Sequence, residues 1–122
     1  MKKIFLILLV ISVSCTSDDT TEDPILCTEE ARPGLEIIIK DATSGAVLTE
    51  GIIVMATDGQ YSETLENVKG TNLFIGAYER KGTYVISISK TGYISIVSDP
   101  VIVTEDICHV ITKNLEFVLS KE

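Results

Sequence analysis

Short runs rich in β-branched residues alternate with turns of glycine, asparagine or aspartate from Pro33 to the C-terminus. The runs recur about every ten residues, and none has the sustained apolar period of an amphipathic helix. This pattern is typical of immunoglobulin-like and transthyretin-like β-sandwiches. It predicts an all-β domain of about seven strands without a helix, at residues 35–40, 51–57, 60–66, 72–78, 82–90, 93–99 and 110–120. Residues 100–104 either continue the sixth of these strands or begin a new one after Asp99 and Pro100.

The alternation within these runs predicts which side chains face the core. In residues 82–90, Ser87 and Ser89 fall on one face, and the apolar side chains fall on the other. Each such half-polar strand needs a second apolar layer above it, so we expect two packed antiparallel sheets. The expected core positions of the first, fifth and last strands are Leu35, Ile37, Ile39, Tyr84, Ile86, Ile88, Leu115, Phe117 and Leu119.

The N-terminus has a different pattern. Lys2 and Lys3 precede an almost unbroken apolar run at residues 4–13. A helix of this length covers about 15 Å, roughly half of a bilayer core, so it is too short to span. A buried first strand or helix would not explain the paired lysines or the abrupt change after Ser14. We therefore predict that residues 1–14 are a signal peptide for export.

Cys15 directly follows this run. The sequence "ISVSC" (residues 11–15) resembles the lipobox of bacterial lipoproteins, in which a small residue precedes a cysteine that is lipidated. Ser14 fits the small position, and Ser12 departs from the usual leucine. The tract "TSDDTTED" (residues 16–23) resembles the acidic signal that sends some Gram-negative lipoproteins to the outer face of the outer membrane. The resemblance implies stable anchoring through several acyl chains on Cys15. An ordinary signal peptide followed by a tail with a free thiol is the alternative.

Charge changes the interpretation of the next segment. The chain has ten basic and eighteen acidic residues. Removal of residues 1–14 removes Lys2 and Lys3, which leaves eight basic residues and a net charge of -10. Six acids precede the first remaining base, Arg32, so we expect residues 15–32 to form an extended tether before a domain at residues 33–122. A chain this acidic also repels nucleic acid, so we expect no DNA or RNA partner.

Three motifs in the domain resemble those of the carboxypeptidase regulatory-like domain, a transthyretin-like relative of the immunoglobulin sandwiches. They are "DATSG" (residues 41–45), the Asp58-Gly59 turn, and the hairpin "GTYVISISKTGY" (residues 82–93). The resemblance extends over nearly all of residues 33–122. It implies a domain without a catalytic centre, either an accessory to an enzyme or transporter or a stand-alone surface domain.

The glycines and tyrosines of these motifs have physical interpretations. Gly82 and Gly92 stand where hairpin ends need a positive φ or a close approach. Tyr84 and Tyr93 are expected to pack in the core or at a sheet edge. Two further tyrosines, Tyr61 and Tyr78, are expected to be exposed. Whether they form a binding surface is not decided by the sequence.

Cys27 and Cys108 are the two cysteines that remain if Cys15 carries lipid. An even pair in an oxidising compartment favours a disulfide. The bond would close a loop of about eighty residues and stabilise the fold by about 4 kcal/mol in the chain-entropy model. It would also attach the segment before Pro33 to the turn before the last strand. The alternative is two free thiols.

The sequence contains little that indicates catalysis. His109 is the single histidine, and adjacent strand residues point to opposite faces, so it should not reach the neighbouring Cys108 thiol. None of the common catalytic or phosphate-binding motifs is present. Asp41, Asp58 and Asp99 lie at strand ends, where turn formation explains them better than Ca²⁺ binding. We therefore expect no enzyme, no metal and no cofactor.

Two functional classes remain. The first is an interaction or accessory module, tethered to the membrane through Cys15, that contacts a protein or glycan partner. The second is an inhibitor or protective factor that inserts an exposed loop into an enzyme. A projecting apolar loop would distinguish the second class, and residues 66–73 are the longest loop candidate in the sequence.

Overall fold

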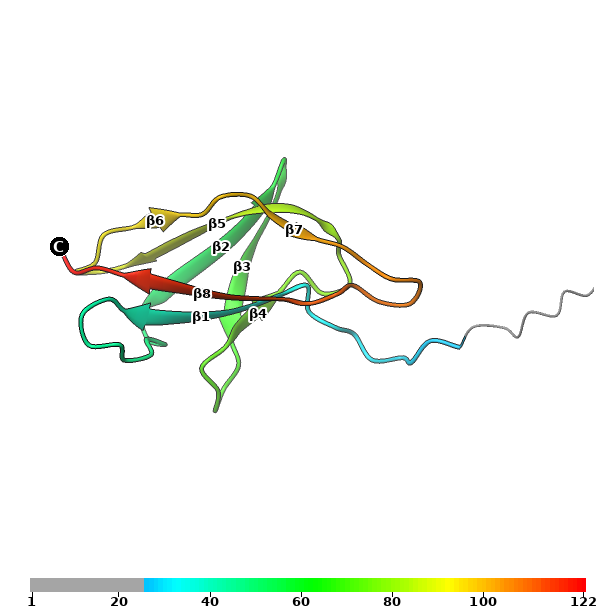
Figure 1. Ribbon diagram of the computed structural model, residues 1–122, viewed down its shortest axis with the longest axis horizontal. Coiled ribbons are helices and arrows are strands. Elements are labelled where there is room, and N and C mark those ends of the chain that lie inside the picture. Colours follow the sequence, from blue (N-terminus) through cyan, green and yellow to red (C-terminus); the bar gives the residue numbers. More distant parts are fainter. Residues whose placement is uncertain (1–25) are drawn as a thin grey trace, which may run out of the picture.

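The computed structural model describes residues 26–122, which form a β-domain (Figure 1). This part of the chain contains no helix, and thus none long and apolar enough to cross a bilayer. The all-β prediction is confirmed. The strands are β1 (Leu35–Asp41), β2 (Ile52–Asp58), β3 (Tyr61–Asn67), β4 (Phe74–Gly76), β5 (Gly82–Lys90), β6 (Ile96–Val97), β7 (Val101–Val103) and β8 (Lys113–Leu119).

Backbone hydrogen bonds connect all eight strands into one sheet with the order β6-β5-β2-β3-β4-β1-β8, and β7 also pairs with β5. The two ends of this path approach each other, because Ile94 N donates to Ser120 O at 2.8 Å and Tyr93 forms a bridge with Lys121. The sheet is therefore nearly closed. Its division into two packed layers stays a prediction.

One strand pair departs from the expected antiparallel arrangement. β8 runs parallel to β1, with Leu35 opposite Lys113 and Asp41 opposite Leu119. The connection after β7 returns the chain to the end of the domain where β1 begins, as the orange loop in Figure 1 shows. β8 can then run only in the direction of β1. All other strand pairs are antiparallel.

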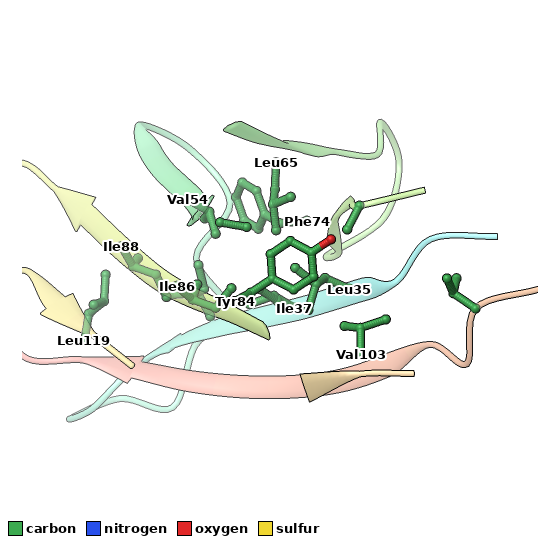
Figure 2. Packing of buried hydrophobic residues seen from close by; sticks show 14 residues of the cluster. Leu35, Ile37, Val54, Leu65, Phe74, Tyr84, Ile86, Ile88, Val103 and Leu119 are labelled. Atoms are coloured by element: carbon green, nitrogen blue, oxygen red, sulfur yellow. The ribbon is translucent and has the colours of Figure 1, made fainter. Parts of the chain in front are cut away.

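The core lies on the inner face of this sheet, as the alternation predicts. Tyr84, Ile86 and Ile88 of β5 are buried. So are the three expected residues of β1. Figure 2 shows them in one cluster with residues of β2, β3, β4, β7 and β8. On β8 only Leu119 is fully buried, while Leu115 and Phe117 are partly buried against the cluster.

Tyr84 is the largest side chain that is fully buried, and its hydroxyl must therefore find a partner. Its Oη donates to the backbone oxygen of Arg80 at 2.8 Å. A tyrosine at the start of a strand that bonds a backbone oxygen a few residues upstream is the geometry of a tyrosine corner. This bond ties the start of β5 to the segment before it.

Several strand boundaries differ from the prediction, and the structure decides between the two alternatives left open for residues 100–104. β4 was expected at residues 72–78 but ends at Gly76, because Ala77 has a φ of 57°, which takes the chain out of the extended conformation. The run at residues 93–104 is interrupted at Asp99 and Pro100, so that β6 and β7 are separate short strands. Proline lacks the N–H that would continue a ladder.

Candidate binding site at residues 76–80

Residues 76–80 ("GAYER") form the sharp connection between β4 and β5. Ala77 has a φ of 57° and Glu79 a φ of 49°. Both lie in the left-handed region, which residues other than glycine seldom adopt. Such strained positions persist only where the surroundings hold them, and they cluster at functional sites. Tyr78 stands between the two.

Glu63 of β3 holds the first half of this segment. Its Oε1 accepts hydrogen bonds from Ala77 N at 3.0 Å and from Tyr61 Oη at 2.7 Å. The bond to this carboxylate, together with burial, raises the pKa of Tyr61 to about 12. Tyr61, which was expected at the surface, is therefore partly buried and bonded. Gly76 makes the arrangement possible, since a Cβ there would overlap both the Glu63 carboxylate and the Leu65 side chain.

Arg80 fastens the second half of the segment to the sheet. Its Nη1 donates to Asp58 Oδ2 at 3.0 Å and to Tyr84 Oη at 3.1 Å. The guanidinium carbon also lies 3.7 Å from the centre of the Tyr61 ring. Gly82 leaves room for the Asp58 carboxylate, so its predicted close approach is confirmed.

Glu79 joins three segments that are distant in the sequence. Its Oε2 accepts from Arg32 N at 3.0 Å and lies 2.5 Å from His109 Nδ1, while Oε1 accepts from Val110 N at 3.1 Å. The hydrogen bond with His109 is the main cause that lowers the pKa of Glu79. The other ring nitrogen, His109 Nε2, lies 2.9 Å from Thr28 Oγ1. Sequence reasoning missed Glu79 and Thr28, because nothing local distinguishes them from other surface residues.

A disulfide between Cys27 and Cys108 lies beside this cluster, with the two Cα atoms 5.3 Å apart. The predicted pairing is confirmed, and the segment before Pro33 lies against the turn before β8, as expected. Asp106 closes that turn, since its Oδ1 accepts from Cys108 N at 2.8 Å and His109 N at 2.9 Å. These backbone hydrogen bonds lower the pKa of Asp106. Figure 1 shows the N-terminal segment and the β7–β8 loop at the same end of the domain.

The order Thr28–His109–Glu79 is that of a hydroxyl, an imidazole and a carboxylate in a hydrolase. Acyl transfer also needs N–H donors directed at the developing oxyanion. The backbone N–H groups of His109 itself and of its neighbour Cys108 already donate to Asp106. Because Glu79 also accepts from two backbone N–H groups, the arrangement fits a clamp on residues 28–32 better than a reaction centre.

A hollow of about 530 Å³ lies next to Tyr78 and is lined by residues of β3, of β4 and of the loop between them. Tyr78 is 48% exposed there, in contrast to the buried Tyr84 and the bonded Tyr61. Ile75 supplies further apolar surface, and Glu63, Glu66, Asn67 and Lys69 supply polar groups. The hollow thus combines an exposed aromatic ring with carboxylate, amide and ammonium groups.

The aspartates that were considered as Ca²⁺ ligands have structural partners or turn positions. Asp41 Oδ1 accepts from Thr43 N and Ser44 N, both at 2.8 Å, and Oδ2 accepts from Tyr93 Oη at 2.7 Å. These bonds lower the pKa of Asp41 to about 2. Asp58 pairs with Arg80, as described above. No group of three or more metal-ligating side chains gathers anywhere in residues 26–122.

The predicted lipidation site, Cys15, and the acidic residues 16–23 lie outside the described residues. The signal peptide at residues 1–14 does so too. Export, lipidation and outer-membrane location therefore stay predictions.

Comparison with known proteins does not assign a family, since no protein-family model and no curated protein matches the chain. The resemblance to the carboxypeptidase regulatory-like domain accordingly stays a prediction.

Proposed function

We propose that this protein is a non-catalytic lipoprotein, anchored through Cys15 in the outer membrane and facing outward, whose β-domain binds a protein or glycan partner. The N-terminal pattern supports the anchor. The disulfide between Cys27 and Cys108 supports an exported protein, because such bonds persist in oxidising compartments. The resemblance to the carboxypeptidase regulatory-like domain agrees with an accessory or surface role.

The exposure of Tyr78 carries the binding part of the proposal. Its neighbours Gly76, Ala77, Glu79 and Arg80 all take part in the contacts that hold the strained turn. Tyr78 is 48% exposed, at the edge of a hollow. A rigid turn that presents a large amphipathic side chain resembles the anchors of binding surfaces, where tyrosine is enriched.

The attachment of residues 27–32 supports a tethered domain. The disulfide and the Glu79 hydrogen bonds hold this segment at one end of the fold. Eleven residues lie between Cys15 and Cys27, and this segment reaches about 40 Å when fully extended. The domain would thus stay close to the membrane, held by a defined end.

An inhibitor or protective factor is the second candidate, and one observation favours it. Ile107 is 73% exposed at the tip of the β7–β8 loop, which the disulfide and Asp106 hold rigid. A projecting apolar side chain on a braced loop suits insertion into an enzyme cleft. The longest loop candidate in the sequence, residues 66–73, has the mixture of asparagine, lysine and glycine expected of a solvated connector, and it is closed by its own hydrogen bonds.

Site-specific photo-crosslinking in intact cells tests both candidates. A photoreactive phenylalanine analogue would replace Tyr78, Ile107 or, as a control on the outer face of β8, Val118, which is 51% exposed. Crosslinks confined to position 78 support the proposed binding surface, and crosslinks confined to position 107 favour the inhibitor. Equal crosslinking at all three positions, or none at any, contradicts a specific binding surface at residues 76–80.

A further inference from the structure

We propose that the hollow beside Tyr78 binds a neutral, hydroxyl-rich saccharide. The inference rests on the proposed binding function and names the ligand class of the same site. It follows from the chemistry of the groups that line the hollow, the strand pairing around it, and the way in which the turn is held.

The apolar part of the hollow suits the C–H face of a sugar ring. Tyr78 presents a half-exposed aromatic ring, and Ile75 lies in the same lining. Aromatic rings are polarisable and flat, and they contribute contact area at little cost in conformational entropy. The volume of about 530 Å³ is that of an ordinary small-ligand site.

The polar part of the hollow is rich in acceptors that still have capacity. Oε1 of Glu63 accepts two hydrogen bonds and its Oε2 packs against Gly76, so this carboxylate serves mainly to hold the turn. Glu66 forms no side-chain hydrogen bond to any described residue. Asn67 is fixed because its Nδ2 donates to Thr71 O and Leu73 O, so its Oδ1 acceptor keeps a constant position. A sugar supplies the matching hydrogen-bond donors, because it carries several hydroxyl groups on neighbouring carbon atoms.

Strand pairing at β4 disfavours an extended peptide there. Ile75 pairs with Glu36 of β1 on one side and with Glu66 of β3 on the other. A peptide therefore could not add to the sheet at β4 through its backbone, although residues 61–65 of β3 pair with β2 alone. Recognition at β4 must come from side chains, which favours a ligand with many hydroxyls.

Charge disfavours acidic saccharides. Glu63 and Glu66 stand against a single Lys69 in the lining, and the whole chain carries a net charge of -8. An anionic ligand would be repelled both locally and by the field of the molecule. A neutral saccharide avoids this repulsion and can still donate to the Glu66 carboxylate.

The turn also holds the backbone on both sides of Tyr78 in place before a ligand arrives. Glu63 fixes Ala77 on one side of Tyr78, and Glu79 is fixed by His109 and Val110 on the other. Preorganisation of this kind reduces the entropy cost of binding.

Binding of the full lipidated chain, purified in detergent, to immobilised oligosaccharides tests the inference. The probes are neutral gluco-, manno-, xylo- and galacto-oligosaccharides, with polygalacturonate as the anionic probe. We expect binding to at least one neutral probe and none to polygalacturonate. Tyr78→Ala should weaken binding about tenfold or more, as for a central aromatic contact, whereas Tyr78→Phe should retain it. Glu66→Gln should weaken binding and Glu116→Gln, on the outer face of β8, should not.

Thermal unfolding of each variant distinguishes loss of contact from loss of fold. Tyr78→Ala is expected to keep the wild-type melting temperature, since the ring is half exposed. Failure of the wild type to bind any neutral probe overturns the inference, and so does binding that Tyr78→Ala leaves unchanged. If crosslinking at position 78 in cells meanwhile captures a protein, the proposed binding function stands and the saccharide is wrong.

Discussion

At the scale of single residues, two glutamates decide the shape of the candidate site. Glu63 of β3 and Glu79 of the turn each accept a hydrogen bond from a backbone N–H of a different segment, and these bonds involve the residues on either side of Tyr78. Neither would be chosen from the sequence, in which they resemble the other acidic residues. Every buried side-chain nitrogen or oxygen in residues 26–122 has a hydrogen-bond partner, so these carboxylates act within a fully satisfied network.

Gly76→Ala should destabilise the domain by about 1–3 kcal/mol, the usual cost of overpacking. The added Cβ would overlap Leu65 in the core and displace the Glu63 carboxylate that holds Ala77. Urea unfolding measures the change. Gly70→Ala is the control, because no heavy atom lies within 4 Å of its Cβ position and it carries only the cost of a positive φ. Equal losses in the two variants would contradict the steric explanation.

Asp41 should make the free energy of unfolding depend on pH in acidic solution. Its hydrogen bonds to Ser44 N, Tyr93 Oη and Thr43 N lower its pKa to about 2, below the value of about 3.9 in an unfolded chain. The folded state therefore gains stability above pH 4 that is lost as the pH falls toward 2. Urea midpoints between pH 2 and pH 5 should fall more steeply in the wild type than in Asp41→Asn. Parallel curves for the two proteins would exclude Asp41 as a source of the pH dependence.

His109 should not support hydrolysis, although its neighbours are arranged like a triad. We expect the wild type and His109→Ala to hydrolyse p-nitrophenyl acetate at the same background rate, because the N–H groups of Cys108 and His109 already donate to Asp106 instead of to an oxyanion. The variant should nevertheless melt at a lower temperature, since Glu79 loses a partner. A rate that depends on both His109 and Thr28 would contradict the non-catalytic proposal.

At the scale of elements, two connections give the domain its distinctive surface. The β4–β5 turn presents Tyr78, and the β7–β8 loop presents Ile107 and receives residues 27–32. Both connections have fixed conformations because side chains from other elements close them. The strands themselves follow from alternation, but these connections need partners from remote parts of the chain.

Breaking the disulfide should lower the stability of the domain but leave its β-sheet folded. Cys27→Ser/Cys108→Ser should lose up to about 4 kcal/mol, which for a domain of this size lowers the melting temperature by about 10 °C or more. The eight strands pair independently of Cys27, so far-UV circular dichroism should keep its β spectrum. A glutamate-specific protease should cleave after Glu29 or Glu30 faster in the variant. Reductant should have no further effect on the cleavage rate of the variant. A variant that resists the protease as well as the wild type does would contradict the attachment of residues 27–32 by the disulfide.

At the scale of the whole molecule, a nearly closed acidic β-domain is attached by one end to a predicted membrane tether. Contacts between the domain and the N-terminal segment begin at Cys27 and Thr28 within the described residues. The fold of the domain therefore does not depend on the predicted anchor. The chain as a whole carries a net charge of -8, which repels other polyanions.

Cys15→Ala should abolish membrane attachment but leave the domain folded. Metabolic labelling with an alkyne fatty acid should mark the wild type and not the variant, because Cys15 is the predicted acylation site. The purified variant should melt within a few degrees of the wild type. Replacement of Asp18, Asp19, Glu22 and Asp23 by alanine is the companion variant, which should keep the label but lose protease accessibility on whole cells. Equal labelling of wild type and Cys15→Ala would remove the lipoprotein assignment.

The strands and core could be predicted because their signals are local. Tyr84, Ile86 and Ile88 alternate with serines along β5, and a strand with one polar face has only one way to bury the other. The disulfide was predictable as a pairing because Cys27 and Cys108 were the two cysteines left once Cys15 was assigned. The strained conformation of Ala77 and Glu79 was not predictable, because neither residue favours a positive φ by itself.

The sequence by itself thus determined the all-β class, the inner face of the long strands and the identity of the disulfide partners, all of which depend on residue type and spacing. Only the tertiary structure decided that β8 runs beside β1 in parallel, that β4 ends at Gly76, and that Glu63 and Glu79 hold Tyr78 at a hollow. Burial favours an apolar face wherever it occurs along the chain. A hydrogen bond between residues tens of positions apart, by contrast, exists only after the remaining strands have brought them within about 3 Å.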